Sequence, residues 1–573
     1  MILKALYDYY NRCDNLPAKG MAYVNFYYAI VIDKEGKFMR LEPLGNEEGI
    51  PLLTLRPEER TSSPVAHSMG DNGSYVLGLV DIDSSVDFQK ELKANFKNYD
   101  CFRKDTEYIY SYLPMNNTAK AVNLFYQNYG IETIKELEND AYWKGFCKIL
   151  KTKKNITFRI NGEKSFAACN KEIIDYKIAT IINNNPESIC LISGDKGTPV
   201  NTTYSSFILK AKSNAKLVSF QINSGYDSYG KKMGLNAPIS EDAEFKYTTA
   251  LLHLLQKDSK NKFILGIRTF VFWASNNNEA SMETEESLFE LLEANDDPNA
   301  NLMKVRKVFE SIYSGIMKTG LDDKFYILGL APNSARIAVV YWTETTLKDF
   351  AEKILRHFSD MEIHDTRKDK KPYMGIREII SSVTLGGKMS DATPNLPESV
   401  VKSIFQGLPY PQTLYSACIR RIRAEQKLTI TRAAIIKAYL NRQSNNNKRI
   451  DIMLDKDNNN QGYLCGRLFA VLEKIQEDAN NISSIRERYM NAASATPSAV
   501  FATILNLSVH HSDKLDEGRR IYFERLKQEI LDKVSAKGFP THLDLQDQGR
   551  FFVGYYHQRQ DFFTSKKEQQ TTI

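Results

Sequence analysis

Segments with the composition of β-strands occupy only about the first 395 residues, and this distribution constrains the fold more than any other feature. There, runs rich in β-branched and aromatic residues alternate with amphipathic stretches, whereas only helical periodicity remains beyond Pro397. The sequence therefore predicts an α+β N-terminal body, with mixed sheets and helical insertions, followed by an all-α C-terminal helical bundle.

Particular strands and helices can be predicted from local patterns. The expected strands are 23–32, 37–41, 75–80, 156–160, 188–192, 216–220, a continuous stretch over 263–273, 325–330 and 336–342. Residues 86–150 read as helical. A helix is also expected over 241–256, with Ser240 as its N-cap. These elements predict four regions: an N-terminal α+β region over 1–150, a central α+β body over 151–396 with a strand-strand-helix module near 323–358, a basic helical segment over 397–450, and a helical bundle over 453–573.

Composition narrows the class of protein. The chain of 573 residues is 42% hydrophobic and 25% charged, which is typical of globular proteins and excludes collagen-like or wholly disordered chains. Its seven cysteines are scattered and never form a C-x-x-C pair, so a thiolate zinc site is not expected. No apolar run approaches the roughly 18 residues of a membrane helix. We expect a cytoplasmic, soluble protein.

Positive charge is concentrated in one segment. The whole chain carries +6, but residues 401–450 hold ten basic side chains against one acid, a net charge of +9 that leaves the remainder at −3. Arg420, Arg423 and Lys427 lie at helical spacing, and Arg421, Arg432 and Lys437 extend the same segment. Such a stripe is suited to following a nucleic-acid backbone. The alternatives are a solvated face and ion pairs with acidic helices.

Residues 220–241 form an unusual polar run after an expected strand. The run combines glycines, which let a backbone approach a ligand closely, with amides, lysines and tyrosines, which bind phosphates, contact base edges and stack on bases. Its candidate binding residues are Asn223, Tyr229, Lys231, Lys232 and Asn236. The alternative is an ordinary surface loop.

The sequence contains only weak matches to known catalytic motifs. His364-Asp365 resembles the metal-binding dipeptide of some hydrolases, but the next histidine is His510. Residues 194–198, Gly-Asp-Lys-Gly-Thr, lack the ending of a phosphate-binding loop. We therefore expect no catalytic residues, no metal and no cofactor.

Seven motifs in order along the chain resemble the Csd family, the large subunit of the type I-C CRISPR Cascade. They are residues 71–78, 223–241, 269–274, 328–336, 419–423 with 432–437, 466–473 and 549–560. The similarity spans essentially the whole chain. It implies a non-catalytic subunit that recognises a PAM in duplex DNA, aids R-loop formation, holds the displaced strand and recruits a separate nuclease-helicase in antiviral defence.

The resemblance also suggests partners and contacts. The partners are a guide CRISPR RNA, target double-stranded DNA, the Cascade backbone subunits and the subunit that binds the guide 5′ end. It places PAM contacts in the N-terminal region, where Asn72 and Ser74 are candidates, although Asn72-Gly73 also suits a tight turn. Lys231, Lys232, Tyr229 and Asn236 become candidates for strand or guide contacts, and the arginines of 420–432 for the displaced strand.

In this family the small helical subunit resembles the C-terminal part of the large one and arises from an internal translation start. Met453 precedes the motif at 466–473, so initiation there gives a product of residues 453–573, which has no net charge. Two rival interpretations stay open. One is a scaffold whose basic segment binds an acidic protein, and the other is a metal-dependent nuclease that uses His364-Asp365.

Overall fold

The computed structural model of the chain describes residues 1–60, 63–82, 84–181, 183–221, 227–293, 300–367, 374–388, 391–443, 449–482 and 484–564. The chain divides into two compact units, residues 1–207 with 213–253 and residues 208–212 with 254–573. The predicted α+β body and the helical C-terminal region are both confirmed. None of the described helices combines the length and the apolar character that crossing a membrane requires.

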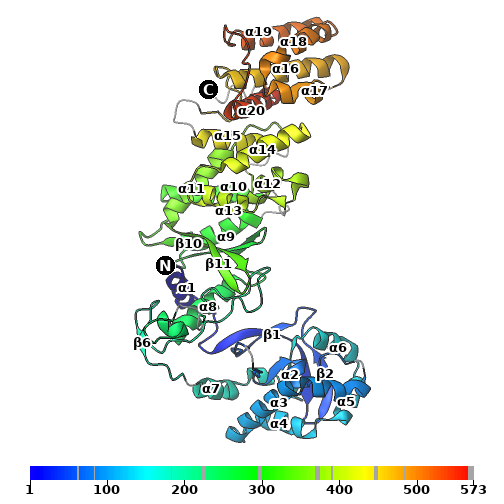
Figure 1. Ribbon diagram of the computed structural model, residues 1–573, viewed down its shortest axis with the longest axis vertical. Coiled ribbons are helices and arrows are strands. Elements are labelled where there is room, and N and C mark those ends of the chain that lie inside the picture. Colours follow the sequence, from blue (N-terminus) through cyan, green and yellow to red (C-terminus); the bar gives the residue numbers. More distant parts are fainter. Residues whose placement is uncertain are drawn as a thin grey trace. The chain divides into compact units, whose positions relative to one another are not determined.

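A five-stranded sheet organises the first unit (Figure 1). Its strands are β1 Met21–Ile32, β2 Phe38–Pro43, β3 Ile50–Leu55, β4 Gly70–Asn72 and β5 Asn155–Ile160. The long strand β1 pairs antiparallel with β2 and β3 and parallel with β5, so it forms the centre of the sheet. Ile30, Ile32 and Phe158 belong to a buried core that includes Phe125 of the helix α4 (Asn117–Asn128) and Phe146 of the helix α6 (Trp143–Lys151).

Helices and a long irregular segment complete this unit. The helices are α1 Ile2–Arg12, α2 Gly73–Val76, α3 Phe88–Tyr112, α4 Asn117–Asn128, α5 Ile131–Glu138, α6 Trp143–Lys151, α7 Lys171–Thr180 and α8 Glu241–Leu254. The Ser240 Oγ accepts a hydrogen bond from the Ala243 backbone N–H at 3.3 Å, which confirms the predicted cap of α8. Between α7 and α8, the described residues include the two-residue strand pair β6 Ser188–Ile189 and β7 Lys196–Gly197.

Four predicted strands are wrong in part or in full. Of the strand predicted over 188–192, only the two residues of β6 are in a sheet, and a turn begins at residue 191. Residues 73–76 are the helix α2, because the Asn72 side chain caps a helical turn there. Residues 216–220 form no strand, and the Lys216 ammonium instead contacts the Glu59 carboxylate. The stretch 263–273 is a hairpin of β8 Lys262–Leu265 and β9 Arg268–Ala274, since Gly266 adopts a φ of 65° and reverses the chain.

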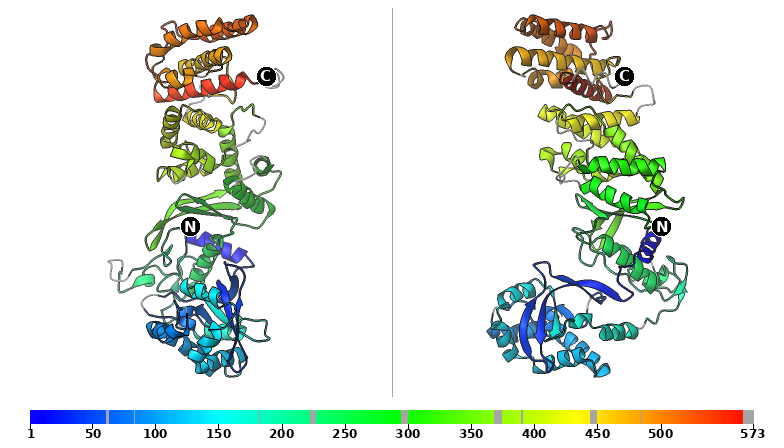
Figure 2. Two further views of the ribbon diagram at one scale, coloured as in Figure 1. Left: turned by 90° about the vertical axis from the view of Figure 1, so that its right-hand side faces the viewer. Right: turned by 180° about the vertical axis from the view of Figure 1, so that it is seen from behind.

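The second unit begins with a four-stranded antiparallel sheet in the order β11-β10-β9-β8. Strands β10 Lys324–Asn333 and β11 Arg336–Thr346 lead into α11 Leu347–Met361, which confirms the predicted strand-strand-helix module. Phe325 stacks on Phe350 of α11 with ring centroids 4.7 Å apart. The helices α9 Glu279–Glu293, α10 Ala300–Ser314 and α11 share this core, and Figure 2 shows them together beside the sheet.

The rest of the second unit is helical. It contains α12 Ile376–Ser382, α13 Leu396–Phe405, α14 Gln412–Glu425, α15 Ile430–Gln443, α16 Gln461–Asn480, α17 Ser484–Ala493, α18 Pro497–Ser512, α19 Glu517–Leu531 and α20 Leu545–Asp561. The backbones of helices α16 and α20 are in direct contact. A Cβ at Gly466 would lie 1.9 Å from the Phe551 carbonyl oxygen, and one at Gly554 would lie 2.3 Å from that of Tyr463. Glycine at these positions is what permits the contact.

Candidate nucleic-acid interface

The polar run 227–240 begins with a tight turn that displays one aromatic and two basic side chains. Tyr229 and Gly230 have φ angles of 52° and 72°, and the Lys231 N–H donates to the Ser228 carbonyl at 2.9 Å. Two consecutive residues with positive φ are characteristic of type I′ turns, which project their central side chains outward. Tyr229 is fully exposed, and Lys231 and Lys232 beside it are exposed as well.

Asn236 holds this turn in shape. Its Oδ1 accepts a hydrogen bond from the Ser228 N–H at 3.0 Å, and its Nδ2 donates to the Asp227 carboxylate and to the carbonyls of Lys231 and Met233 at 3.1 to 3.2 Å. With both ends of the amide engaged inside the loop, Asn236 positions the tip. The other predicted amide, Asn223, lies outside the described residues.

The base of the loop is fixed to its own unit. Gly234 lies against the Val200 carbonyl, where an added Cβ would be 1.9 Å from the oxygen, and the Val200 N–H donates to the Ile239 carbonyl at 2.9 Å. A fixed backbone reduces the entropy lost when exposed side chains are ordered by a ligand. The tip, Tyr229 with Lys231 and Lys232, thus offers a stacking ring and two ammonium groups in one place.

Asn72 and Ser74 lie where β4 meets α2. The Asn72 Oδ1 accepts hydrogen bonds from the Ser74 N–H at 3.1 Å and from the Ser74 hydroxyl at 2.7 Å. Ser74 is 6% exposed, whereas Asn72 is partly exposed. Their mutual bonds form a helix cap. Ser74 can contact a DNA groove only if this cap opens. Asn72 is the more exposed of the two residues, and its amide nitrogen donates a hydrogen bond to the Asp71 carboxylate.

In the basic segment, α14 carries the arginines at 420, 421 and 423. Arg420 is exposed, whereas Arg421 forms an i,i+4 ion pair with Glu425. The helix ends at Glu425, and Gln426 turns the chain with a left-handed φ of 50°. Lys427 is exposed but lies beyond this turn, so the expected continuous stripe of Arg420, Arg423 and Lys427 on one helix is interrupted.

Helix α15 is buried over residues 431–440, so Arg432 and Lys437 do not present the exposed charge that the predicted nucleic-acid contact requires, and they do not form a solvated face either. Helices α11, α12, α14 and α20 all contact it. The Arg432 guanidinium bonds to Glu425 at 2.6 Å and to the carbonyls of Ser382 and Lys427 at 2.9 Å. The Lys437 ammonium is 3.4 Å from the Ser359 carbonyl, and burial lowers the pKa of this amine to about 8.

Other cations of the segment are also engaged. Arg442 pairs with Asp360 at 2.6 Å, with both side chains less than 5% exposed, and Lys402 pairs with Glu398 at 2.7 Å. Lys448 lies outside the described residues. The surface charge described for this segment therefore falls mainly to Arg420, Lys427 and Arg449. Arg449 is one of the ten basic residues of the segment, but the sequence did not single it out as a binding residue. A count of charges does not show which side chains are exposed.

Residues 6–563 match the family described as CRISPR-associated protein (Cas_Csd1). The chain belongs to this family. No curated protein matches the chain. Family membership indicates the large subunit of a Cascade-type complex, which works with a guide RNA and DNA.

Two of the motifs that carried the resemblance meet in the packing of α16 on α20. Glycines in both motifs permit the backbone contact, and charged side chains join the helices across it. Glu473, which is fully buried, accepts hydrogen bonds from the Tyr555 hydroxyl at 2.5 Å and from Arg486 at 2.7 Å. These motif residues of the Csd1 family therefore stabilise the C-terminal bundle.

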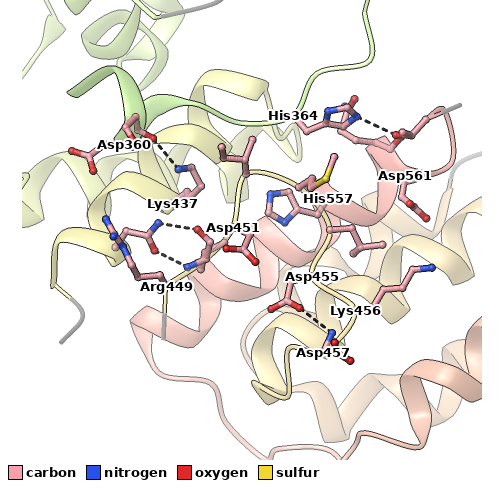
Figure 3. Close-up of a pocket in the computed structure, with 18 residues that line it drawn as sticks. Asp360, His364, Lys437, Arg449, Asp451, Asp455, Lys456, Asp457, His557 and Asp561 are labelled. Atoms are coloured by element: carbon pink, nitrogen blue, oxygen red, sulfur yellow. Dashed lines mark hydrogen bonds between the residues drawn. The ribbon is translucent and has the colours of Figure 1, made fainter. Parts of the chain in front are cut away.

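The dipeptide His364-Asp365 lies at a cavity of about 820 Å³ bounded by the segment 449–457 (Figure 3). His364 lines the cavity, and its Nε2 is 3.1 Å from the Thr564 hydroxyl. Burial alone would raise the pKa of Asp365, but hydrogen bonds from Arg367 hold it below its usual value. Within the described residues, no group of three or more His, Cys, Asp and Glu side chains is placed to hold a metal ion.

Proposed function

We propose that this protein is the non-catalytic large subunit of a type I-C CRISPR Cascade. In this function it recognises the PAM in duplex DNA, aids R-loop formation, holds the displaced strand and recruits a nuclease-helicase supplied by another protein. Pairing with the guide RNA reads most of the target, so the chain needs phosphate contacts and a small number of base contacts.

The loop tip formed by Tyr229, Lys231 and Lys232 is the observation that carries this proposal. All three side chains are exposed, and the amide of Asn236 orders the backbone beneath them. Ammonium groups beside an aromatic ring match a phosphate backbone with an adjacent base. Arg420 and Lys427 supply further exposed charge for a nucleic-acid strand.

We also propose that the small helical subunit begins at Met453. This residue lies between α15, which ends at Gln443, and α16, which begins at Gln461. A product that starts there contains α16 to α20 without cutting a helix, and the Asn460 side chain that caps α16 is retained. Met490, by contrast, is buried within α17, and a start there discards α16.

Such a product would expose a face that the full chain covers. In the full chain, the Tyr415 hydroxyl donates to the Leu545 carbonyl at 2.6 Å, and a Cβ at Gly549 would lie 2.0 Å from that hydroxyl oxygen. Helix α20 therefore packs on α14 and α15 when they are present. Without them, its outer face is available for a neighbouring subunit.

Co-expression with the neighbouring genes and a CRISPR array, followed by purification through this chain, tests the proposal. The expected result is a discrete guide RNA, the backbone subunits and a fragment of residues 453–573. Recovery of the chain alone, without RNA, contradicts it. Met453→Leu should abolish the fragment while the matched change Met490→Leu leaves it, and an undiminished fragment from the first variant rejects this start.

A further inference from the structure

Three tyrosines lie together at the surface of the first unit. In the sequence they are distant from the loop tip. Tyr108 and Tyr112 are one turn apart on α3, and Tyr176 comes from α7 (Figure 1 shows both helices). The Tyr112 and Tyr176 rings are stacked with centroids 5.5 Å apart and an interplanar angle of 28°, and Tyr108 lies 4.8 Å from Tyr112. We call this cluster the tyrosine platform.

The platform is exposed although it is made of aromatic rings. Tyr108 and Tyr112 are 45% and 58% exposed. Tyr176 is half-buried beside them. A large aromatic side chain is stabilised by burial, so two exposed rings that adjoin a third, half-buried ring mark a surface for binding. The tyrosines already contact one another, and a planar ligand can extend their stack.

Contacts beneath the platform fix its two helices together. Lys177, next to Tyr176, pairs with Asp105 of α3 at 2.7 Å. The Asn116 side chain caps α4 and donates to Glu172 of α7 at 2.6 Å. These polar contacts set the distance between α3 and α7, so the rings need little rearrangement to accept a ligand.

Basic side chains continue from the platform along the same face of α3. Lys93, Lys97 and Lys104 precede Tyr108 and Tyr112 at successive spacings of four or seven residues, which place them in one row of a helix. All three lysines are exposed, and Lys104 pairs with Asp100 at 2.7 Å. The exposed aromatic Phe96 adjoins this row. A row of ammonium groups that ends in stacked rings is complementary to a polyanion that carries planar bases.

We propose that the tyrosine platform and the lysine row of α3 bind single-stranded DNA, with the rings stacking on unpaired bases and the lysines contacting phosphates. The chemistry matches that of sequence-independent single-strand binding. This inference deepens the proposed function and rests on it, because duplex opening is the step that supplies unpaired bases. Paired bases in a duplex keep their faces covered and offer the rings no partner.

The test compares oligonucleotides that share phosphates but differ in bases. Fluorescence anisotropy of the purified full chain would be measured with a 12-nucleotide single strand, the same strand with abasic sites, and the corresponding duplex. The expected result is a weaker affinity for the abasic strand. Tyr112→Ala should weaken binding of the intact strand by about tenfold, leave abasic and duplex binding unchanged, and remove most of the difference.

Tyr112→Phe is the matched control, since it keeps the ring and should bind as the unchanged chain does. Equal affinity for intact and abasic strands would overturn the proposal. So would a loss of protein partners from the purified complex on Tyr112→Ala with DNA binding intact, because the platform would then be a protein-docking surface. Failure to recover guide RNA in the co-expression experiment is a separate result, which would contradict the proposed function and leave the oligonucleotide comparison to be judged by itself.

Discussion

The loop tip at 229–232 and the basic segment at 401–450 use positive charge in opposite ways. The loop tip has two lysines, and both are exposed on a turn that Asn236 holds in shape. The basic segment has ten cations, yet Arg432, Lys437 and Arg442 are directed into contacts within the protein. The basic segment therefore has more positively charged residues than the loop tip, but a smaller fraction of them is exposed to a ligand.

The difference arises from what surrounds each backbone. A turn has solvent on its outer side, so its side chains remain available. Helix α15 is surrounded by other helices, and a cation on it needs a carboxylate or carbonyl partner to offset the loss of water. Burial thus turns cations into structural groups.

The largest expected effect comes from the most deeply buried ion pair. Arg442→Met leaves Asp360 without its partner, and we expect the free energy of unfolding to fall by about 3–5 kcal/mol in chemical denaturation. Arg420→Met, the same change on the surface of the same segment, should alter it by less than about 0.5 kcal/mol. Equal effects from the two variants would remove the distinction between buried and exposed cations.

The pH dependence of folding stability at Lys437 gives a further test of the difference between buried and exposed cations. The Lys437 pKa of about 8 in the folded chain lies below the usual 10.5, so the unfolded chain binds more protons between these values and stability rises with pH there. Below pH 8 the buried charge therefore costs stability. We expect Lys437→Met to stabilise the protein by about 3 kcal/mol at pH 7 and by much less near pH 10. Denaturation curves at both pH values measure this, and a pH-independent difference would contradict it.

At the loop tip, charge removal should affect binding and not folding. The double variant Lys231→Ala, Lys232→Ala should reduce the slope of log affinity for duplex DNA against log salt by about 2, since each lost phosphate contact removes roughly one counterion. The exposed lysines Lys144 and Lys148 of α6 provide a matched control. If their removal lowers the slope equally, the tip has no special role.

The smallest expected effect tests the support beneath the tip. Asn236→Ala removes the hydrogen bonds that shape the turn while leaving every charge in place, so we expect DNA affinity to fall by about threefold through added disorder. Asn117→Ala at the start of α4 changes an exposed amide and should leave affinity unaltered. A binding isotherm identical to that of the unchanged chain would show that the tip does not depend on Asn236.

Local patterns predicted the elements that local forces determine. The strand-strand-helix module and the Ser240 cap follow from alternation, turn residues and capping preferences within short windows. The segment 75–80 has strand-like composition, but the Asn72 cap at its start favours a helical turn. Such competition between composition and a single cap is hard to judge without the backbone.

The candidate site depended more on tertiary contacts. The sequence contains Tyr229, Lys231 and Lys232 as neighbours, so their shared exposure on a turn could be anticipated. The burial of Arg432 depends on distant helices that cover α15, and the platform needs Tyr176 to reach Tyr112 from another helix. Spacing along one helix predicts the pair Tyr108 and Tyr112, but the third ring is a property of the fold.

The glycine contact between α16 and α20 also sets an order of events during synthesis. The face of α16 around Gly466 is completed by Phe551, which the ribosome adds only after α17, α18 and α19 have been made. Until then, α16 and the side of α15 that receives Gly549 have apolar surfaces without their partners. Domains generally fold as units from the N-terminus during synthesis, so the first unit can fold while the ribosome is still translating, whereas closure of the C-terminal bundle requires α20, the last helix to be made.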